Sequence, residues 1–415
     1  MVITLPATLN VGDTVRVSGE SVNRWALAQN AGQTVATTNL PGNTVPGAVW
    51  TTHDTPRHWW FTASSADGNK LAAVDNPGFI YTSDDGGETW TPRPISAGPQ
   101  NWAKIAMTPD GTTLAAVSIA VPGAGGHAGG QIYTSSNGGV DWIARDQDRE
   151  WVSVAVSADG LKMVATVING NIYTSTDAGA TWKPHLTIGE TTATGRVWRA
   201  VASSSDGNKL VAVASSGHIY TSIDAGLNWT ERSTPATQFT AAETATGRNW
   251  YRVTSSADGS KLAAADNGGL IYVSNDSGKT WTAPQPAFFA AYHGIASTAD
   301  GDKLAWIVPN VTGETNANIW LSNDAGVTSK AVEKARQWRG IAMSADGNRL
   351  VAAENGGDAF GSGLVGLIYT SRGNRTATGT LGSITGGQGD SIQVQYLGNG
   401  QFKVLNSSTL PFVIK

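Results

Sequence analysis

The feature that most constrains this chain is a unit of about 45 residues that occurs seven times in succession. In one copy, Trp250 opens a run of alternating residues that ends at the turn Asp258-Gly259. A second apolar run, 261–265, leads through a glycine-rich loop to a third, 270–274. Short runs of this kind, separated by Asp-Gly and Gly-Gly turns, predict three β-strands, with a fourth beginning at Trp281. A repeated four-stranded unit is typical of a β-propeller blade.

The same register holds in every copy, because an aromatic residue stands eight positions before the Asp of each Asp-Gly turn. The aromatics are Trp59, Trp102, Trp151, Trp198, Trp250, Tyr292 and Trp338, and the turns begin at Asp67, Asp110, Asp159, Asp206, Asp258, Asp300 and Asp346. Seven aromatics and seven turns in one register predict an all-β fold with a seven-bladed β-propeller.

Both ends of the chain fall outside the repeat. Residues 1–47 and 376–415 each contain a Gly-Asp turn followed by a strand-like run, at Gly12-Asp13 and at Gly389-Asp390. We therefore predict one small β-domain formed from both termini, with residues 48–375 forming the propeller between its two halves. The alternative is two terminal hairpins that pack on the propeller. Residues 25–33 and 389–396 also resemble short β-modules at the ends of bacterial and phage surface proteins.

The last blade needs an outer strand that the seventh copy does not supply, since no Trp follows its third strand. Val49-Trp50-Thr51-Thr52 matches the start of a fourth strand and precedes Trp59 at a plausible loop distance. We expect residues near Trp50 to complete this blade, which would remove an unpaired edge. The rival is a strand from Arg375 to Leu381.

The first six copies close on the pattern Ser-x-Asp-x-Gly-x-x-Trp or a variant of it, as in Ser83 to Trp90 and Ser274 to Trp281, whereas the seventh copy lacks it. Ser329 replaces the Trp in the sixth copy. The pattern resembles the Asp-box, or BNR repeat, of sialidase-like propellers, which also occurs in photosystem II assembly factors. We expect a structural role, because a short Asp accepts backbone hydrogen bonds in a tight turn and the Trp ring is buried beneath it. The predicted structural residues are Asp85, Asn137, Asp177, Asp224, Asp276 and Asp324.

The net charge and the short apolar runs argue against nucleic acid and membrane as partners. A net charge of −4 gives no general attraction to nucleic acid or to an anionic membrane. No apolar run is long enough to cross a bilayer, so membrane insertion is not expected. The chain has no cysteine, and its first residues show no signal peptide. We favour an extracellular or surface location on the resemblance alone.

A set of Arg and aromatic residues recurs where the innermost strand of each blade begins. In five copies an Arg stands two positions before the aromatic, and strand alternation places both side chains on the same side. The candidate ligand-binding residues are Arg57, Trp59, Trp102, Arg149, Trp151, Arg196, Trp198, Arg248, Trp250, Tyr292, Arg336 and Trp338. Lys104, Arg199, Arg252 and Arg339 add positive charge nearby.

These residues have a functional and a structural interpretation. Arg side chains suit carboxylate or sulfate groups, and indole rings stack on sugars or cations. Alternatively, each Trp packs between blades and each Arg pairs with a neighbour. Five long loops share this face and are expected to set specificity. They comprise residues 119–130, 188–195, 231–247, 309–318 and 355–366.

An enzyme is the alternative class. A sialidase needs an Arg triad, a Tyr nucleophile with a Glu, and an Asp acid, but the Phe/Tyr-Arg-Ile-Pro motif of that family is absent. Carboxylates for glycoside hydrolysis could come from the rim. The candidates are Asp54, Asp75, Asp146, Asp148, Glu190, Glu243, Asp266, Glu314, Glu354 and Asp358. The His residues show no metal-ligand spacing, so we expect neither a metal nor a cofactor.

The sequence therefore favours a non-catalytic recognition protein that binds a glycan, or a protein surface, through the Arg/Trp face. A scaffold or assembly-factor propeller with a protein partner is the first alternative, and a sialidase-like glycoside hydrolase is the second. A homo-oligomer formed through the terminal β-domain is a further option.

Overall fold

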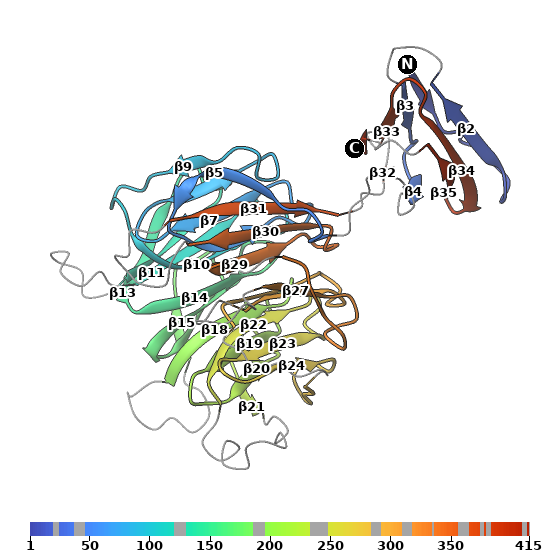
Figure 1. Cartoon of the computed structure of the whole chain (residues 1–415). Coiled ribbons are helices and arrows are strands. Elements are labelled where there is room, and N and C mark those ends of the chain that lie inside the picture. The colour runs from blue at the N-terminus through green and yellow to red at the C-terminus, as the bar shows by residue number, and fades with distance from the viewer. Residues whose placement is uncertain are drawn as a thin grey trace. The chain divides into compact units, whose positions relative to one another are not determined.

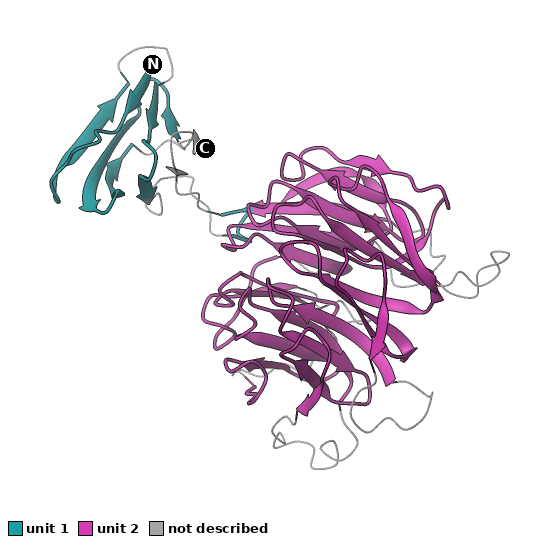
Figure 2. Cartoon of the chain, turned by 180° about the vertical axis from the view of Figure 1, so that it is seen from behind, with its two compact units in different colours: residues 1–49, 372–415 teal, residues 50–371 magenta. Residues whose placement is uncertain are grey.

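The chain folds into two compact units (Figure 2). Unit 1 combines Met1–Val49 with Arg372–Lys415, and unit 2 is Trp50–Ser371. Every regular element in the computed structural model is a β-strand among the residues that it describes. These residues are 1–19, 25–36, 46–119, 130–185, 196–232, 248–283, 292–308, 318–333, 336–355, 365–373, 377–378, 383–408 and 413–414.

In unit 2 the described strands form successive antiparallel groups, which we number as blades 1 to 7 (Figure 1). Blades 3 and 4 share one sheet, because β15 (Met163–Gly170) also pairs with β18 (Arg196–Ser203). The innermost strands are β6 (Trp59–Ser64), β10 (Asn101–Met107), β14 (Trp151–Val156), β18 (Arg196–Ser203), β22 (Trp250–Ser255), β25 (Gly294–Ser297) and β29 (Trp338–Met343). The second strands are β7 (Leu71–Asp75), β11 (Leu114–Ile119), β15 (Met163–Gly170), β19 (Leu210–Ala214), β23 (Leu262–Asp266), β26 (Leu304–Ile307) and β30 (Arg349–Glu354).

The third strands are β8 (Ile80–Ser83), β12 (Gly130–Ser135), β16 (Ile172–Ser175), β20 (Ile219–Ser222), β24 (Ile271–Ser274), β27 (Ile319–Ser322) and β31 (Gly366–Arg372). The outer strands are β9 (Thr91–Arg93), β13 (Ile143–Arg149), β17 (Lys183–His185), β21 (Thr230–Arg232), β28 (Lys330–Ala331) and β5 (Thr51–Arg57). In blade 5, a single bridge between Val273 and Thr282 takes the place of an outer strand in the described part of the chain.

The apolar core is divided among the blade interfaces. Each described cluster combines second- and third-strand residues of one blade with the innermost strand of the next, as where Val74 and Ile80 meet Trp102. The ring closes where Val351 and Ala353 of blade 7 pack with Trp59 of blade 1. This closed packing confirms the predicted all-β propeller fold, because each blade buries its two faces against two neighbours.

Strand β5 lies at the point where the ring closes. It pairs with β31, with Thr52 opposite Tyr369. Trp50 packs 6.0 Å from the ring of Trp338, and His53 Nε2 lies 2.7 Å from Thr370 Oγ1. The rival segment Arg375–Leu381 contains β32 (Ala377–Thr378), which pairs with β4 (Thr34–Ala36) in unit 1.

The Asp-Gly turns form one face of the propeller, which we call the turn face; the opposite end of each blade is the loop face. In each turn a Ser or Thr hydroxyl donates to the Asp, as from Thr108 to Asp110 at 2.5 Å. Backbone hydrogen bonds also join neighbouring turns around the ring, for example from Ala66 N to Pro109 O at 2.7 Å. The corresponding bond from blade 2 to blade 3 cannot form, since Pro109 has no N–H.

Unit 1 takes strands from both ends of the chain. One sheet has the order β1-β3-β33-β36 and the other β2-β34-β35-β4-β32. Its core includes Trp25 and Leu27 from the first half and Ile384 and Phe402 from the second. The remaining bounds are β1 (Val2–Thr4), β2 (Thr14–Ser18), β3 (Trp25–Ala28), β33 (Ser383–Gly386), β34 (Ser391–Gly398), β35 (Gln401–Ser407) and β36 (Val413–Ile414).

Candidate functional site

The aromatic residues that open the blades lie inside the blade interfaces. None of the seven is more than 2% exposed, and they are Trp59, Trp102, Trp151, Trp198, Trp250, Tyr292 and Trp338. Trp59, for example, meets the ring of Tyr81 edge-on at 5.0 Å. Rings buried this deeply present no face to a ligand, so the expectation that they stack on a ligand is wrong. Their burial fits the structural interpretation, because second- and third-strand residues of the preceding blade pack against them, as Val74 and Ile80 do against Trp102.

Each of the five predicted Arg residues stacks on the third-strand Tyr of the blade whose first aromatic follows that Arg in the sequence. The guanidinium of Arg57 lies 4.4 Å from the ring of Tyr81 and 3.5 Å from Asp54. The other four repeat this stack: Arg149 on Tyr173, Arg196 on Tyr220, Arg248 on Tyr272 and Arg336 on Tyr369. Arg149, Arg248 and Arg336 also lie near Asp146, Asp266 and Glu333. These arginines therefore have structural partners, and their charge is largely matched.

A second group of side chains converges at the propeller axis. In six blades a β-bulge follows the first aromatic, as between Trp59 and Phe61. A bulge redirects the side chains beside it. One or two positions after the aromatics lie eight residues that we call the axial cluster: Trp60, Phe61, Lys104, Arg199, Tyr251, Arg252, His293 and Arg339.

Contacts within the axial cluster join several blades. Phe61 of blade 1 lies under two cations, Lys104 at 4.7 Å and Arg252 at 5.0 Å. Arg252 also stacks on Tyr251 at 3.9 Å and donates from Nε to the carbonyl oxygen of His293 at 2.8 Å. The contact between blades 1 and 5 crosses the axis, because these blades are not neighbours. Side chains of the cluster therefore meet on the axis.

The remaining contacts extend the cluster to blades 4 and 7. Arg199 lies 5.8 Å from the ring of Tyr251, and Arg339 lies 4.7 Å from the ring of Trp60. Arg339 Nη1 lies 2.9 Å from Nδ1 of His293. Apart from Phe61, the members of the cluster are partly exposed, so a binding partner can reach them.

The electrostatics of the cluster are dominated by positive charge. Burial and the charge of Arg252 lower the pKa of Lys104 to about 7. Burial, Arg339 and Arg252 lower the pKa of His293 to about 3, so its ring is neutral and accepts from Arg339. Arg252 above all lowers the pKa of the Tyr251 phenol. Lys104 is therefore the group whose charge changes near neutral pH.

The sequence prediction included the four cations of the cluster only as additional positive charge near the candidate ligand-binding residues. It missed Trp60, Phe61, Tyr251 and His293, because alternation from the buried aromatic does not account for the bulge. A sequence pattern could have identified most of them: in five blades the residue directly after the first aromatic is aromatic or basic. These residues are Trp60, Arg199, Tyr251, His293 and Arg339.

The predicted Asp-box residues make the hydrogen bonds of tight turns. Asp177 accepts from Ser175 Oγ at 2.7 Å and from the backbone and hydroxyl of Thr181 at 2.9 and 2.6 Å. Trp182 Nε1 donates to Gly179 O at 3.0 Å. Asp85, Asn137, Asp224, Asp276 and Asp324 accept from the corresponding Ser in the same way. Asn137 also donates to Asp141, which supplies the missing carboxylate.

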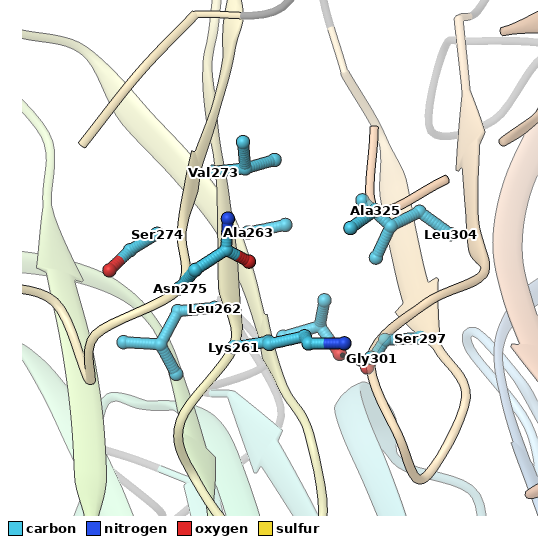
Figure 3. Close-up of a pocket in the computed structure, with 11 residues that line it drawn as sticks. Lys261, Leu262, Ala263, Val273, Ser274, Asn275, Ser297, Gly301, Leu304 and Ala325 are labelled. Carbon is cyan, nitrogen blue, oxygen red and sulfur yellow. Dashed lines mark hydrogen bonds between the residues drawn. The ribbon is translucent and has the colours of Figure 1, made fainter. Parts of the chain in front are cut away.

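A small pocket lies between blades 5 and 6 toward the turn face (Figure 3). Leu262, Val273 and Leu304 are among the residues that line it. In this interface Ser329 replaces the Asp-box Trp, while Trp306 stands where blades 1 to 5 and 7 have Ala. An indole ring on the second strand thus occupies this interface in place of one on the outer strand, and Trp320 of the third strand packs with it.

Several of the candidate rim carboxylates form ion pairs or hydrogen bonds within the propeller. Asp266 lies 3.5 Å from Arg248, and Glu354 accepts from the hydroxyl of Tyr369 at 2.9 Å. Burial raises the pKa of Asp75, which accepts from the backbone of His58 at 3.1 Å. Glu190, Glu243, Glu314 and Asp358 lie outside the described residues, as do most of the five predicted specificity loops.

The described residues contain neither a metal-ligand group nor a membrane-spanning helix. No group of three or more His, Asp or Glu residues is placed there to hold a metal ion. That part of the chain also contains no helix long and apolar enough to span a membrane.

Comparison with known proteins supports the Asp-box motif and the propeller fold. The model of the BNR/Asp-box repeat matches residues 81–92. No curated protein matches the chain.

Solved structures with a similar fold include two of YCF48. "YCF48 bound to D1 peptide" is 15% identical with a TM-score of 0.53, and the alignment covers 81% of this chain and 100% of that one. YCF48 from Cyanidioschyzon merolae is 16% identical with a TM-score of 0.53, covering 79% and 99%. U3-55K is 11% identical with a TM-score of 0.59, covering 79% and 99%. Identities this low establish a shared propeller fold alone.

Proposed function

We propose that this chain is a non-catalytic recognition protein that binds a protein partner through the axial cluster of its propeller. The composition of the cluster carries the proposal. Trp60 and Tyr251 lie partly exposed beside Arg199, Arg252 and Arg339. Tryptophan, tyrosine and arginine are the residues that most often dominate the free energy of protein–protein binding.

The similarity to YCF48 supports this choice of partner class, because one YCF48 structure contains a bound D1 peptide. That peptide belongs to the YCF48 complex. For this chain we propose only the same class of partner, a peptide or a protein, because its propeller has a similar fold.

Glycan binding is the second candidate, and it has lost its main support. It was favoured by the seven aromatics of the blades, which are buried. Among the described residues of the axial cluster, Trp60 and Tyr251 are the partly exposed aromatics that could stack on a sugar. A glycan array on which the chain gives no signal at high concentration would remove this candidate.

Glycoside hydrolysis is the third candidate. It predicts turnover of aryl-sialosides, glucosides or galactosides that stops when one rim carboxylate, such as Asp75, is changed to its amide. A chain that turns over none of them fits the non-catalytic proposal.

The experiment that tests protein recognition compares two variants in affinity capture followed by mass spectrometry. Trp60→Ala/Tyr251→Ala changes the axial cluster. Ile223→Ser/Leu227→Ser is the matched control, since these side chains are 72% and 71% exposed in an Asp-box on the turn face. We expect a set of proteins retained by the wild type and the control but lost by the axial variant.

Circular dichroism should first establish that both variants are folded. Arg339→Gln provides a second axial variant if the double substitution destabilises the blade. Capture of the same proteins by all folded variants would refute the proposal.

A further inference from the structure

The axial cluster gathers four cations from four blades. Lys104, Arg199, Arg252 and Arg339 belong to blades 2, 4, 5 and 7. We propose that Lys104, Arg199 and Arg252 form a binding site for a carboxylate group. This inference rests on the proposed function, since it names the chemical group that the partner presents to the cluster.

The first argument is the absence of a matching negative charge among the described residues. The charges that shift the pKa values of Lys104, Arg252 and His293 belong to members of the cluster, and none is a carboxylate. Like charges held together in a partly buried region repel one another. An external anion would relieve this repulsion.

The second argument is the supply of hydrogen-bond donors. Arg199 Nε is buried and has no hydrogen-bond partner in the described part of the chain. Arg252 donates from Nε to His293 O at 2.8 Å and from Nη1 to Tyr251 O at 3.0 Å, which holds its guanidinium in place. A positioned guanidinium is well suited to a carboxylate, because little ordering is needed when the ligand binds.

The third argument concerns the size of the anion. Around the cluster, four of the five stacked Arg residues of the loop face lie near an acidic group: Asp54, Asp146, Asp266 or Glu333. The positive charge is therefore concentrated at the axis rather than spread along a track. A nucleic acid or another long polyanion needs such a track. A single carboxylate fits the observed charge.

The experiment uses isothermal titration of the full chain with two probes at constant ionic strength. One probe is a short peptide containing three Glu residues, and its control has Gln at those positions. The second probe is citrate, which separates a free small carboxylate from a peptide. We expect binding of the Glu peptide and none of the Gln peptide, and binding of citrate if the site also accepts the free form.

Arg199→Gln tests the residue on which the second argument depends. A hydrogen bond between charged groups contributes about 1.5–3 kcal/mol, so the affinity should fall by about tenfold or more. Without ligand, the melting temperature of this variant should equal or exceed that of the wild type, because a repulsive charge has been removed. Arg149→Gln is the control, since Arg149 stacks on Tyr173 away from the axis, and it should keep the wild-type affinity.

Proton linkage gives a readout that a structural role would not produce. Lys104 has a pKa lowered to about 7, and a bound carboxylate raises it again. Ligand binding slightly above that pH should therefore take up protons, which appears as a dependence of the measured heat on the buffer. Uptake should disappear in Lys104→Met.

Equal affinity for the Glu and Gln peptides would overturn the carboxylate site. So would unchanged affinity in Arg199→Gln combined with a lower melting temperature, which is the outcome for a structural arginine. If partner capture depends on Trp60 and Tyr251 but not on Arg199, the proposed function stands and the carboxylate site falls.

Discussion

Arg252 of β22 and Phe61 of β6 lie on blades that are not neighbours, yet the guanidinium stands 5.0 Å from the centre of the phenyl ring. Lys104 lies 4.7 Å from the same ring. Two cations of blades 2 and 5 therefore share one aromatic ring of blade 1 at the propeller axis. The negative potential of the ring face partly offsets the repulsion between them.

Replacing Phe61 with Leu keeps an apolar side chain of similar size but removes the aromatic face. Each cation–π contact contributes about 0.5–2 kcal/mol, so we expect a loss of about 1–3 kcal/mol in the free energy of unfolding, measured in urea. The pKa of Lys104 should fall further below about 7, because the ring favours the charged amine. An NMR titration of the lysine measures this shift.

Phe61→Tyr is the control for this substitution, since it retains the aromatic face. If Phe61→Leu left both stability and the Lys104 pKa at wild-type values, the ring would merely fill space.

The Asp residues of the turn face predict how stability depends on pH. Hydrogen bonds lower the pKa values of Asp110, Asp177, Asp258 and Asp276 to about 2. The unfolded value is about 3.9, so these groups favour the folded state above that pH and lose the effect as the pH falls toward 2. The urea midpoint should be steady down to about pH 5 and then fall.

Asp177→Asn/Asp276→Asn tests the origin of this fall. With two of the carboxylates removed, the decrease in the urea midpoint between neutral and acidic pH should be smaller than in the wild type. An identical decrease would assign the acid sensitivity to other groups.

Much of the fold could be predicted from the sequence because its turns need particular residues. Gly111 and Gly179 have φ values of 68° and 82°, a region that favours glycine. The Asp-Gly turn and the Asp-box therefore recur as visible patterns. The all-β propeller class follows from their register.

The site was less predictable, for two physical reasons. An indole ring has the same sequence signature in a core and on a rim, and here Tyr81 and residues of blade 7 cover Trp59. The bulges also break the alternation on which the prediction relied. Contacts across the axis, such as Phe61 with Arg252, join residues far apart in the chain and cannot be inferred from spacing within one repeat.

The interface between blades 5 and 6 predicts a compensating pair of substitutions. Trp306 is only 5% exposed, so Trp306→Ala should cost about 3–5 kcal/mol in the free energy of unfolding. Restoring the Asp-box ring with Ser329→Trp should recover part of this loss in the double variant, because the interface then has the arrangement of the other blades. In the wild-type background the same Trp adds a further large ring to an interface that already holds Trp306, and it should gain nothing.

A double-mutant cycle from urea unfolding measures this coupling. Additive effects of the two substitutions would show that Trp306 does not stand in for the missing ring. Leu227→Trp, at an exposed Asp-box position of blade 4, is the control for adding an indole.

Strand β5 predicts how the ring depends on residues before the first blade. Trp50 contacts Trp338, and Thr52 pairs with Tyr369, so residues 50–57 cover the edge of blade 7. A chain of residues 50–373 should unfold cooperatively. A chain of residues 58–373 should melt at a lower temperature and associate, because β31 then has an open edge. Thermal melts and light scattering distinguish the two.

Adding a peptide of residues 48–58 to the shorter chain should raise its melting temperature, because the peptide can re-form the pairing with β31. A peptide with Trp50→Ala and His53→Ala should be less effective, since it loses the ring contact with Trp338 and the bond to Thr370. Equal melting temperatures for the two truncated chains would mean that the ring holds without β5. Closure would then depend on the other contacts between blades 7 and 1, among them the packing of Trp59 against Val351 and the hydrogen bond from Ala345 N to Ala66 O.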